Sequence, residues 1–282
     1  MDKLLIIDGH SLLFQMFFGM PSRIVNKQGK AIHGTLGFVG ALNKIIALTK
    51  PTHIAVVFDS EHENARTEIL PEYKANRVDY SEVPDSENPF SQLEDIYTAL
   101  DFMNIKHFEA DGLEADDVIA SYAITYGTDM QIVISWFDSD FFQLINDNTC
   151  ILRYRGDKTV ICDEAYIENK YGILPDQYAD FKSLTGDSAD NIKGAERVGP
   201  KTAAALINQF GSLHDVLNNT NDISKPYIRE SIIQSSARLA NNYEIIKLSN
   251  NAALKFNIND LFRSDMNFTT MDILKGIGVY SQ

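Results

Sequence analysis

The sequence predicts an α/β fold in which helices cover both faces of a mostly parallel sheet. Three short apolar runs have the composition of strands buried on both faces, and stretches with helical periodicity separate them. Each run ends at an aspartate or shortly before one. The runs are Lys3–Ile7, Ile54–Phe58 and Gln131–Ile134, and the helical stretches are Gly34–Leu48, Phe90–Met103 and Leu113–Tyr126.

The second half of the chain predicts a hairpin followed by a mainly helical region. Cys150 and Cys162 flank a turn-forming stretch, and we interpret both as small buried hydrophobes, because two cysteines make no disulfide framework. We expect a first domain over residues 1–174 and a helical one over residues 175–282. Helices are predicted at Asp163–Tyr171, Asp176–Leu184, Lys225–Leu248 and Asn267–Tyr280, with a strand near Leu254–Ile258.

Composition narrows the class of protein. The chain has 282 residues, of which 44% are hydrophobic, and this suits one large or two modest globular domains. We find no signal-peptide pattern and no apolar run that could span a bilayer, so we expect a soluble, cytoplasmic protein without membrane contact. The net charge of −14 argues against a polyanion partner. However, acids that bind metal would be neutralised locally, so net charge alone decides nothing.

Acidic residues gather where the predicted strands end. Asp8, Asp59, Asp138 and Asp140 lie at or just past the three runs, where ligands bind in open α/β sheets. One such aspartate is usually a helix cap or a turn residue. Several carboxylates at one sheet edge would repel one another and raise each other's pKa values. We therefore expect a divalent cation among them.

The stretch Gly112-Leu-Glu-Ala-Asp-Asp-Val118 adds three carboxylates at the start of a predicted helix. One or two acids in a first helical turn complement the helix dipole, which is the structural alternative. Three within four residues repel one another, so they favour a compensating cation. The three are Glu114, Asp116 and Asp117.

Two further stretches could bind phosphate. Residues 61–87 form a long irregular insertion, which is usually functional or mobile, although a plain surface excursion is the alternative. Within it Arg66, Tyr73, Lys74 and Arg77 offer phosphate contacts and a stacking face. The second stretch, Gly199-Pro-Lys-Thr202, places backbone N–H groups at the start of an alanine-rich helix. Asp187 and Asp190 precede it and would share a face if that segment is helical.

Seven stretches together resemble the bacterial 5′-nuclease, or flap endonuclease, family, which includes the 5′-nuclease domain of bacterial DNA polymerase I. They occur in family order, and no polymerase region follows them, so we expect a free-standing relative of that domain. The stretches are Ile7-Asp-Gly-His-Ser11, Val57-Phe-Asp59, Pro71-Glu-Tyr-Lys-Ala-Asn-Arg77, Gly112-Leu-Glu-Ala-Asp-Asp117, Asp138-Ser-Asp-Phe-Phe-Gln-Leu144, Leu184-Thr-Gly-Asp-Ser-Ala-Asp-Asn191 and Gly199-Pro-Lys-Thr-Ala203.

The resemblance implies a PIN-like nuclease core over residues 1–174 with a helical arch at about residues 61–95. It implies that residues 175–282 hold a helix–three-turn–helix (helix-hairpin-helix) DNA-binding motif. It also implies a two-metal site, whose ligands we assign by motif. Asp8, Asp59 and Glu114 match the first ion's ligands, Asp116 the carboxylate between the ions, Asp138, Asp140 and Asp190 the second ion's ligands, and Asp117 and Asp187 acids that hold metal or metal-bound water.

The basic residues of the family motifs also have matches. We assign Lys74 to the scissile phosphate, where its charge would offset the developing anion. Tyr73 and Arg77 stand beside it at the foot of the implied arch, Tyr73 as a stacking residue or, alternatively, a core aromatic. Gly199, Lys201 and Thr202 match the hairpin that holds phosphates of the downstream duplex. Family members bind K⁺ at this hairpin, so K⁺ is expected there.

The implied activity is hydrolysis of DNA at 5′ flaps and 5′ ends, as a flap endonuclease and 5′→3′ exonuclease of DNA replication and repair. We expect a monomer that binds branched or 5′-ended duplex DNA. Two Mg²⁺ ions are expected, with Mn²⁺ able to substitute, because hard cations prefer oxygen ligands. The six histidines show no zinc-site spacing. Two alternatives stay open: a DNA-junction binding protein that does not cleave, and a PIN-like ribonuclease.

Some residues depart from the family pattern. Residues 61–87 contain eight Asp and Glu against three Lys and Arg, whereas family arches are often more basic, so we expect weaker binding of a single strand. Phe137 and Ser139 flank Asp138 where relatives often have Gly and Lys. Glu196 and Arg197 stand where relatives often show Gly and Pro, which would hinder close approach of backbone to phosphate unless Arg197 contacts phosphate itself.

Overall fold

The computed structural model describes residues 1–60, 65–263 and 268–280. At its centre is a six-stranded sheet with the strand order β3-β2-β1-β4-β5-β6. Neighbouring strands run parallel, except that β6 pairs antiparallel with β5. The predicted α/β fold with a mostly parallel sheet is confirmed. The strands are β1 (Lys3–Asp8), β2 (His53–Phe58), β3 (Lys106–Glu109), β4 (Gln131–Ser135), β5 (Thr149–Arg153) and β6 (Val160–Cys162).

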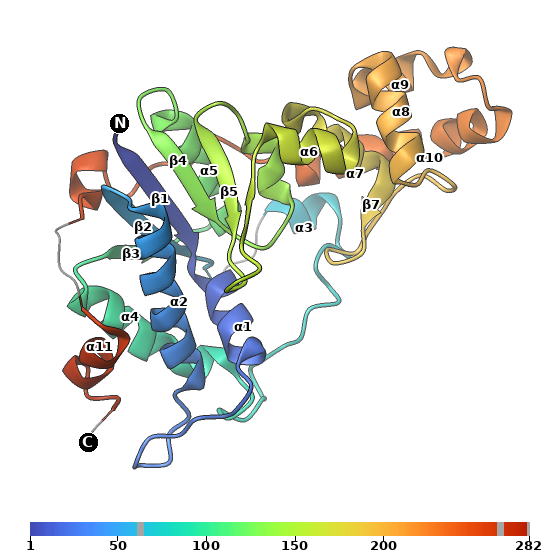
Figure 1. Ribbon diagram of the computed structural model, residues 1–282. Coiled ribbons are helices and arrows are strands. Elements are labelled where there is room, and N and C mark those ends of the chain that lie inside the picture. The colour runs from blue at the N-terminus through green and yellow to red at the C-terminus, as the bar shows by residue number, and fades with distance from the viewer. Residues whose placement is uncertain (61–64, 264–267, 281–282) are drawn as a thin grey trace.

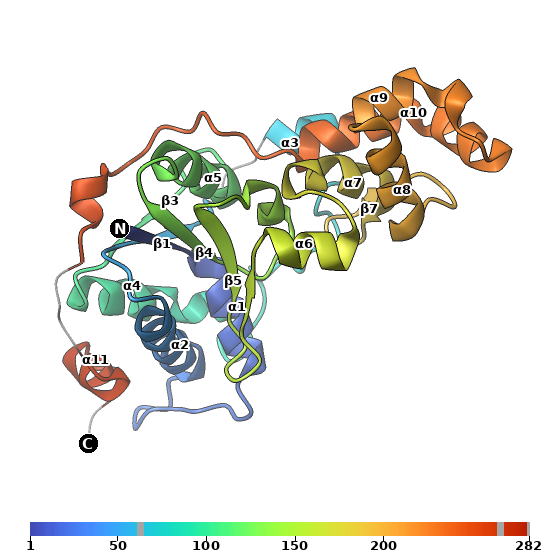
Figure 2. The ribbon, with the colours of Figure 1, turned by 45° about the horizontal axis from the view of Figure 1, so that its top comes forward.

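Helices cover both faces of the sheet because successive strand residues point to opposite sides. Leu4 and Ile6 of β1 pack in one core with α5, whereas Leu5 and Ile7 pack in a second core with α1 and α2. Figure 2 shows α5 on one face and α1, α2 and α4 on the other. These helices are α1 (Gly9–Gly19), α2 (His33–Thr49), α4 (Leu93–Phe102) and α5 (Ala115–Tyr126).

A helical region follows the sheet and lies at one end of the molecule (Figure 1). The helices predicted at Asp163–Tyr171, Asp176–Leu184 and Lys225–Leu248 are confirmed within a few residues. Asp187 and Asp190 do not lie on a helix; they belong to a small hairpin. The elements are α6 (Glu164–Tyr171), α7 (Tyr178–Thr185), β7 (Gly186–Asp187), β8 (Ile192–Lys193), α8 (Pro200–Phe210), α9 (Leu213–Asn218) and α10 (Pro226–Ile246).

After α10 the chain runs back along the core. The backbone N–H of Ala252 donates to Ser121 Oγ and that of Phe256 to Tyr122 OH, both on α5. The last helix, α11 (Thr270–Gly276), packs against α2 and α4, at the opposite end of the molecule from α8 to α10 (Figure 1). The chain beyond residue 174 therefore divides into a helical part beside the core and a tail that returns to it.

The strand predicted near Leu254–Ile258 is wrong. Leu254, Phe256 and Ile258 are partly buried against the core while their neighbours are exposed, which explains the period-two pattern. Residues 254–257 pair with no strand in the described part of the chain, and a 3-10 helix (Ile258–Leu261) follows them.

The segment expected to form a helical arch consists mostly of turns where it is described. Only α3 (Ala65–Ile69) is α-helical before residues 70–88, which form turns, and residues 61–64 lie outside the described residues. Pro71, Pro84 and Pro89 interrupt the segment, and proline removes a helix hydrogen bond and clashes with the preceding turn. None of the described helices combines the length and the apolar character needed to cross a bilayer.

Candidate active site

The first part of the site lies at the carboxyl ends of β1 and β2. Asp8 ends β1 and caps α1, because its Oδ1 accepts a hydrogen bond from Ser11 N at 2.6 Å. Its Oδ2 is buried without a hydrogen-bond partner among the described residues. Asp59 follows β2, and its Oδ1 accepts a hydrogen bond from Ala115 N at 2.9 Å. This bond joins the end of β2 to the start of α5.

The start of α5 brings Glu114 and Asp116 to the same place. Glu114 immediately precedes the helix, and Asp116 lies in its first turn. Glu114 is buried and accepts hydrogen bonds from Lys74 Nζ at 2.8 Å, from Tyr73 OH at 3.3 Å and from Arg66 Nη1. Three residues of the segment after β2 therefore converge on one carboxylate.

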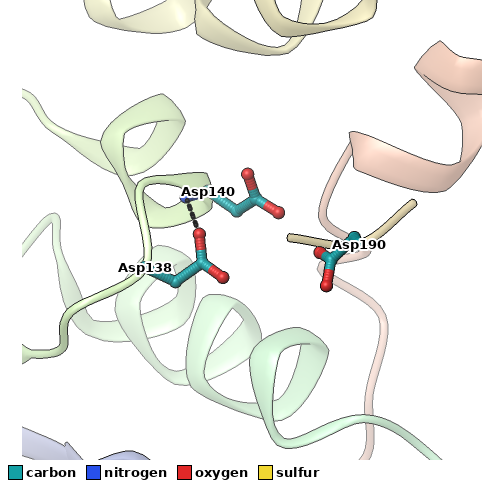
Figure 3. A group of neighbouring side chains, drawn as sticks. All are labelled: Asp138, Asp140 and Asp190. Atoms are coloured by element: carbon teal, nitrogen blue, oxygen red, sulfur yellow. Dashed lines mark hydrogen bonds between the residues drawn. The ribbon is translucent and has the colours of Figure 1, made fainter. Parts of the chain in front are cut away.

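Asp138, Asp140 and Asp190 form a second acidic cluster (Figure 3). One carboxylate oxygen from each lies within 4.8 Å of the other two. Asp138 and Asp140 follow β4, whereas Asp190 lies in the turn between β7 and β8. Three oxygens at this spacing suit a hard divalent cation.

A buried lysine that the sequence reasoning missed lies beside the second cluster. Lys182 on α7 contacts Asp140, and its Nζ lies 2.5 Å from Asp187 Oδ2 and 3.7 Å from Asp138 Oδ1. No local signal identifies it, because Asp180 and Ser183 stand beside Lys182 in the same helix and make this stretch look partly exposed. The structure shows that every residue from Tyr178 to Leu184 is buried.

Negative charge exceeds positive charge at the site among the described residues. Nine carboxylates meet four basic side chains there. Burial raises the pKa values of Asp8 and Asp116 well above the usual range, and neighbouring carboxylates raise them further. Burial, partly opposed by Lys182, raises the pKa of Asp140 to about 7. Together with the unpartnered Oδ2 of Asp8, this surplus fits the binding of divalent cations. The basic side chains are Arg66, Lys74, Arg77 and Lys182.

Lys74 is held in a backbone conformation that residues other than glycine rarely adopt. Its φ is +56°, in the left-handed region, and its N–H donates to the carbonyl oxygen of Asp190 at 3.2 Å. Burial lowers the pKa of the ammonium, but the carboxylates of Asp116 and Glu114 raise it, and the net pKa is raised. Strain of this kind persists where the surrounding structure imposes it, commonly at functional sites. Lys74 is therefore a fixed, charged group between the two acidic clusters.

Arg66 is placed differently from the expectation that it contacts DNA phosphate. Its side chain is buried, and Nη1 binds Glu114 while Nη2 donates to Asp117 Oδ1 at 2.9 Å. Its Nε donates to the carbonyl oxygen of Ile245, at the end of α10, at 2.9 Å. Asp117 also accepts a hydrogen bond from Ser249 N at 2.8 Å. Arg66 and Asp117 thus fasten α3, α5 and α10 together.

Tyr73 is a core residue in this structure, which is the alternative that the sequence left open. Its ring is buried among Ala179, Ile192, Ile245 and Ile246. The ring therefore presents no open face to a base here. Its hydroxyl donates to Glu114, and the Lys74 ammonium lies 4.8 Å from the centre of its ring.

His10 is a second residue whose role the sequence reasoning missed, although it lies within a quoted motif. Its Nδ1 accepts a hydrogen bond from Asp59 N at 3.2 Å and lies 3.8 Å from Asp59 Oδ2. The imidazole is mostly buried and packs edge-on against Phe58 and Phe90. His10 therefore supports the position of Asp59.

The second predicted phosphate site lies at the start of α8. Gly199 caps this helix, and its carbonyl oxygen accepts hydrogen bonds from Thr202 N and Ala203 N. Lys201 and Arg197 are exposed there. Arg197 has a φ of +62°, where glycine is favoured, and its Nε lies 3.8 Å from Glu196 Oε1. The start of α8 and the turn before it thus present two basic side chains to solvent, and one of them lies beside an acid.

Metal-free protein should become less stable as the pH rises from about 5 to about 8. The pKa of Asp140 is about 7 in the folded chain and lower when unfolded, so the folded state binds more protons in this range and loses stability as they leave. Thermal unfolding in EDTA should show a falling Tm, and Mg²⁺ should raise Tm more at high pH than at low pH. The Asp140→Asn variant should show a flatter pH dependence. A Tm that rises across this pH range in EDTA would contradict a raised pKa of Asp140 in the folded chain.

Comparison with family models gives two adjacent matches. Residues 3–172 match "5′-3′ exonuclease, N-terminal resolvase-like domain", and residues 173–269 match "5′-3′ exonuclease, C-terminal SAM fold". The DNA polymerase I of Caldicellulosiruptor bescii is 35% identical over 237 residues, which are 82% of this chain and 27% of that protein. The thermostable DNA polymerase I of Thermus aquaticus is 32% identical over 256 residues, 90% of this chain and 29% of that protein. The chain thus spans less than a third of the length of these relatives.

Solved structures share the fold. T5 5′-exonuclease with bound zinc superposes with a TM-score of 0.73 at 21% identity, covering 98% of this chain and 99% of the other. A complex of the bacteriophage T5 D15 flap endonuclease with DNA and metal ions gives a TM-score of 0.73 at 22% identity, with the same coverage. The catalytic core of Rad2 in complex with DNA gives 0.61 at 15% identity, covering 98% and 93%. Structural relatives therefore hold divalent metal ions and DNA.

Proposed function

The chain belongs to the 5′-3′ exonuclease family, and on this premise we propose that it hydrolyses DNA phosphodiesters at 5′ flaps and 5′ ends. The observation that carries the proposal is the meeting of nine carboxylates with Lys74 at the carboxyl edge of the sheet. This excess of negative charge would bind divalent cations, and the bound cations would attract an anionic substrate. The proposed substrate is branched or 5′-ended duplex DNA, bound by a monomer.

We propose that two divalent ions, Mg²⁺ or Mn²⁺, are held by the two acidic clusters. Asp8, Asp59 and Glu114 would hold one, Asp138, Asp140 and Asp190 the other, with Asp116 between them. Asp117 and Asp187 would hold metal or metal-bound water, as the family motifs imply. Arg66 and Lys182 contact these two acids, and they contact Glu114 and Asp140 as well. When bound, the ions would stabilise charge on the phosphate and lower the pKa of the attacking water.

The chain's own basic groups would orient the DNA. Lys74 lies between the clusters and would place its ammonium on the scissile phosphate, offsetting the charge that develops there. Arg77, whose Nη2 lies 3.3 Å from Asp190 Oδ1, is more exposed and would bind a neighbouring phosphate. Gly199, Lys201 and Thr202 would hold the downstream duplex through its backbone, with K⁺ bound at the same hairpin by resemblance to the family.

A cleavage assay tests the proposal. The purified chain is incubated with a labelled 5′-flap duplex in Mg²⁺, in Mn²⁺ and in EDTA, and we expect product near the junction only with a divalent ion. Tight retention of the duplex without product in either metal would favour a junction-binding protein. Faster cleavage of an RNA flap than of a DNA flap of the same sequence would favour a ribonuclease.

A further inference from the structure

Helix α10 connects the helical region with the acidic site. It spans Pro226–Ile246 and is the longest helix in the described part of the chain, and Figure 2 shows it reaching from α9 toward α3. Its side chains contact the turn that precedes α8, and residues of the acidic site bind the backbone at its end. The helical rise places Ser231 and Ile246 about 22 Å apart along the axis. α10 therefore bridges the two places that are proposed to hold DNA.

The outer contacts of α10 hold the turn before α8. Residues 194–199 lie in neither a helix nor a strand, so their position depends on what they pack against. Three side chains of α10 donate hydrogen bonds to successive carbonyl oxygens at the start of this stretch. The bonds join Asn242 Nδ2 to Lys193 O at 2.9 Å, Arg238 Nη2 to Gly194 O at 3.1 Å, and Ser231 Oγ to Glu196 O at 2.6 Å.

Gln143 fastens the inner end of α10 to the second acidic cluster. It lies three residues after Asp140, and its Nε2 donates to the carbonyl oxygens of Asp140 at 2.8 Å and of Ile246 at 3.1 Å. Its Oε1 accepts a hydrogen bond from Leu248 N at 3.0 Å. Both donors of the amide are thus used. Arg66 ties the same end of α10 to the first part of the site.

The length of this connection matters for DNA that is held at one end and cut at the other. If the duplex is bound at the start of α8, the distance from there to the ions decides which phosphodiester meets them. One nucleotide step along a strand of B-DNA is about 3.4 Å. An α-helix keeps its length because each turn is closed by its own hydrogen bonds. A helix fastened at both ends therefore prevents a slip of one nucleotide.

We propose that α10 sets the position of the cut, with Ser231 and Gln143 as positioning residues at its outer and inner ends. This inference rests on the proposed function. The hydrogen bonds of both side chains go to backbone groups, so each acts through the segment that it holds. Loss of either side chain should leave the carboxylates in place and let the duplex shift relative to them. The length of the product should then change.

Mapping the cleavage position tests this inference. The full chain is incubated in Mg²⁺ with a duplex whose flap is labelled at its 5′ end, and single-turnover products are separated at nucleotide resolution. The wild type should give one main product. Gln143→Met and Ser231→Ala should each raise the fraction that is cut one nucleotide away by about fivefold, because a hydrogen bond within a protein shifts an equilibrium by roughly this factor.

Gln177→Met is the matched control. Gln177 also joins two backbone groups of the helical region, since its Oε1 accepts from Leu174 N at 3.0 Å and its Nε2 donates to Gly211 O at 3.0 Å. These bonds involve neither α10 nor the acidic clusters. This variant should cut at the wild-type position. The Tm of each variant shows whether it is folded, and if one of the two α10 variants is not, the other decides alone.

Three outcomes would overturn the inference. Cleavage at an unchanged position in folded Gln143→Met and Ser231→Ala, at any rate, would show that these contacts serve stability alone. The same change of product in Gln177→Met would show that any loosening of the helical region suffices. A wild type that cleaves no flap in Mg²⁺ or Mn²⁺ would remove the proposed function, and this inference with it.

Discussion

Asp116→Asn should lower the cleavage rate of a 5′-flap duplex by at least about a thousandfold. The substitution removes the carboxylate proposed to lie between the two ions, which together would lower the free-energy barrier by several kcal/mol. The charges of Glu114, Asp59 and Asp8 all act on Asp116. No other proposed ligand is assigned to both ions. Single-turnover cleavage in Mg²⁺ measures the effect.

Asp111→Asn is the control for this loss. Asp111 is exposed and lies five residues before Asp116, so its neutralisation changes the net charge equally without touching the site. It should cleave at the wild-type rate. Near-normal turnover by Asp116→Asn would show that the proposed ligand set is wrong.

Lys74→Asn should slow the chemical step by about a hundredfold to a thousandfold while changing duplex affinity little, as when one preorganised donor to a developing anion is removed. Asparagine tolerates positive φ better than most residues, so the backbone near +56° is spared additional strain. Rate and affinity are measured separately, by single-turnover cleavage and by anisotropy in EDTA. Equal losses in both would make Lys74 an anchor for DNA instead.

The chain offers a matched control for this substitution. Lys50 ends α2 with a φ of +48° and is exposed. Lys50→Asn therefore makes the same chemical change in the same backbone region, away from the acidic clusters. It should cleave normally, and any difference in Tm between the two variants measures what the contacts of Lys74 add to stability.

The strands that are buried on both faces were predictable from the sequence, because a short run of apolar residues is typical of such strands. It did not locate β3, where only Phe108 of Lys106–Glu109 is buried. An edge strand keeps one side open to solvent, so its composition carries little signal. The acids at the ends of β1, β2 and β4 followed from the topology, since parallel strands bring their carboxyl ends to one edge.

The partners of those acids were not predictable from the sequence. Lys182 and Arg66 are basic residues in helices, and nothing local indicates whether such a residue points to solvent or inward. Their contacts depend on how α7 and α3 pack, which is decided by distant residues. Tyr73 shows the same limit: its motif predicted a stacking surface, and the packing of Ile245 and Ile246 covers its ring.

The division of the second acidic cluster between the two family matches has a consequence for inheritance. Asp138 and Asp140 belong to the segment that matches the N-terminal family model, and Asp190 belongs to the segment that matches the C-terminal one. On the proposed function, a recombinant that joined halves from two relatives would need an aspartate from each half at these positions to complete the cluster. Selection would therefore act on the two halves together.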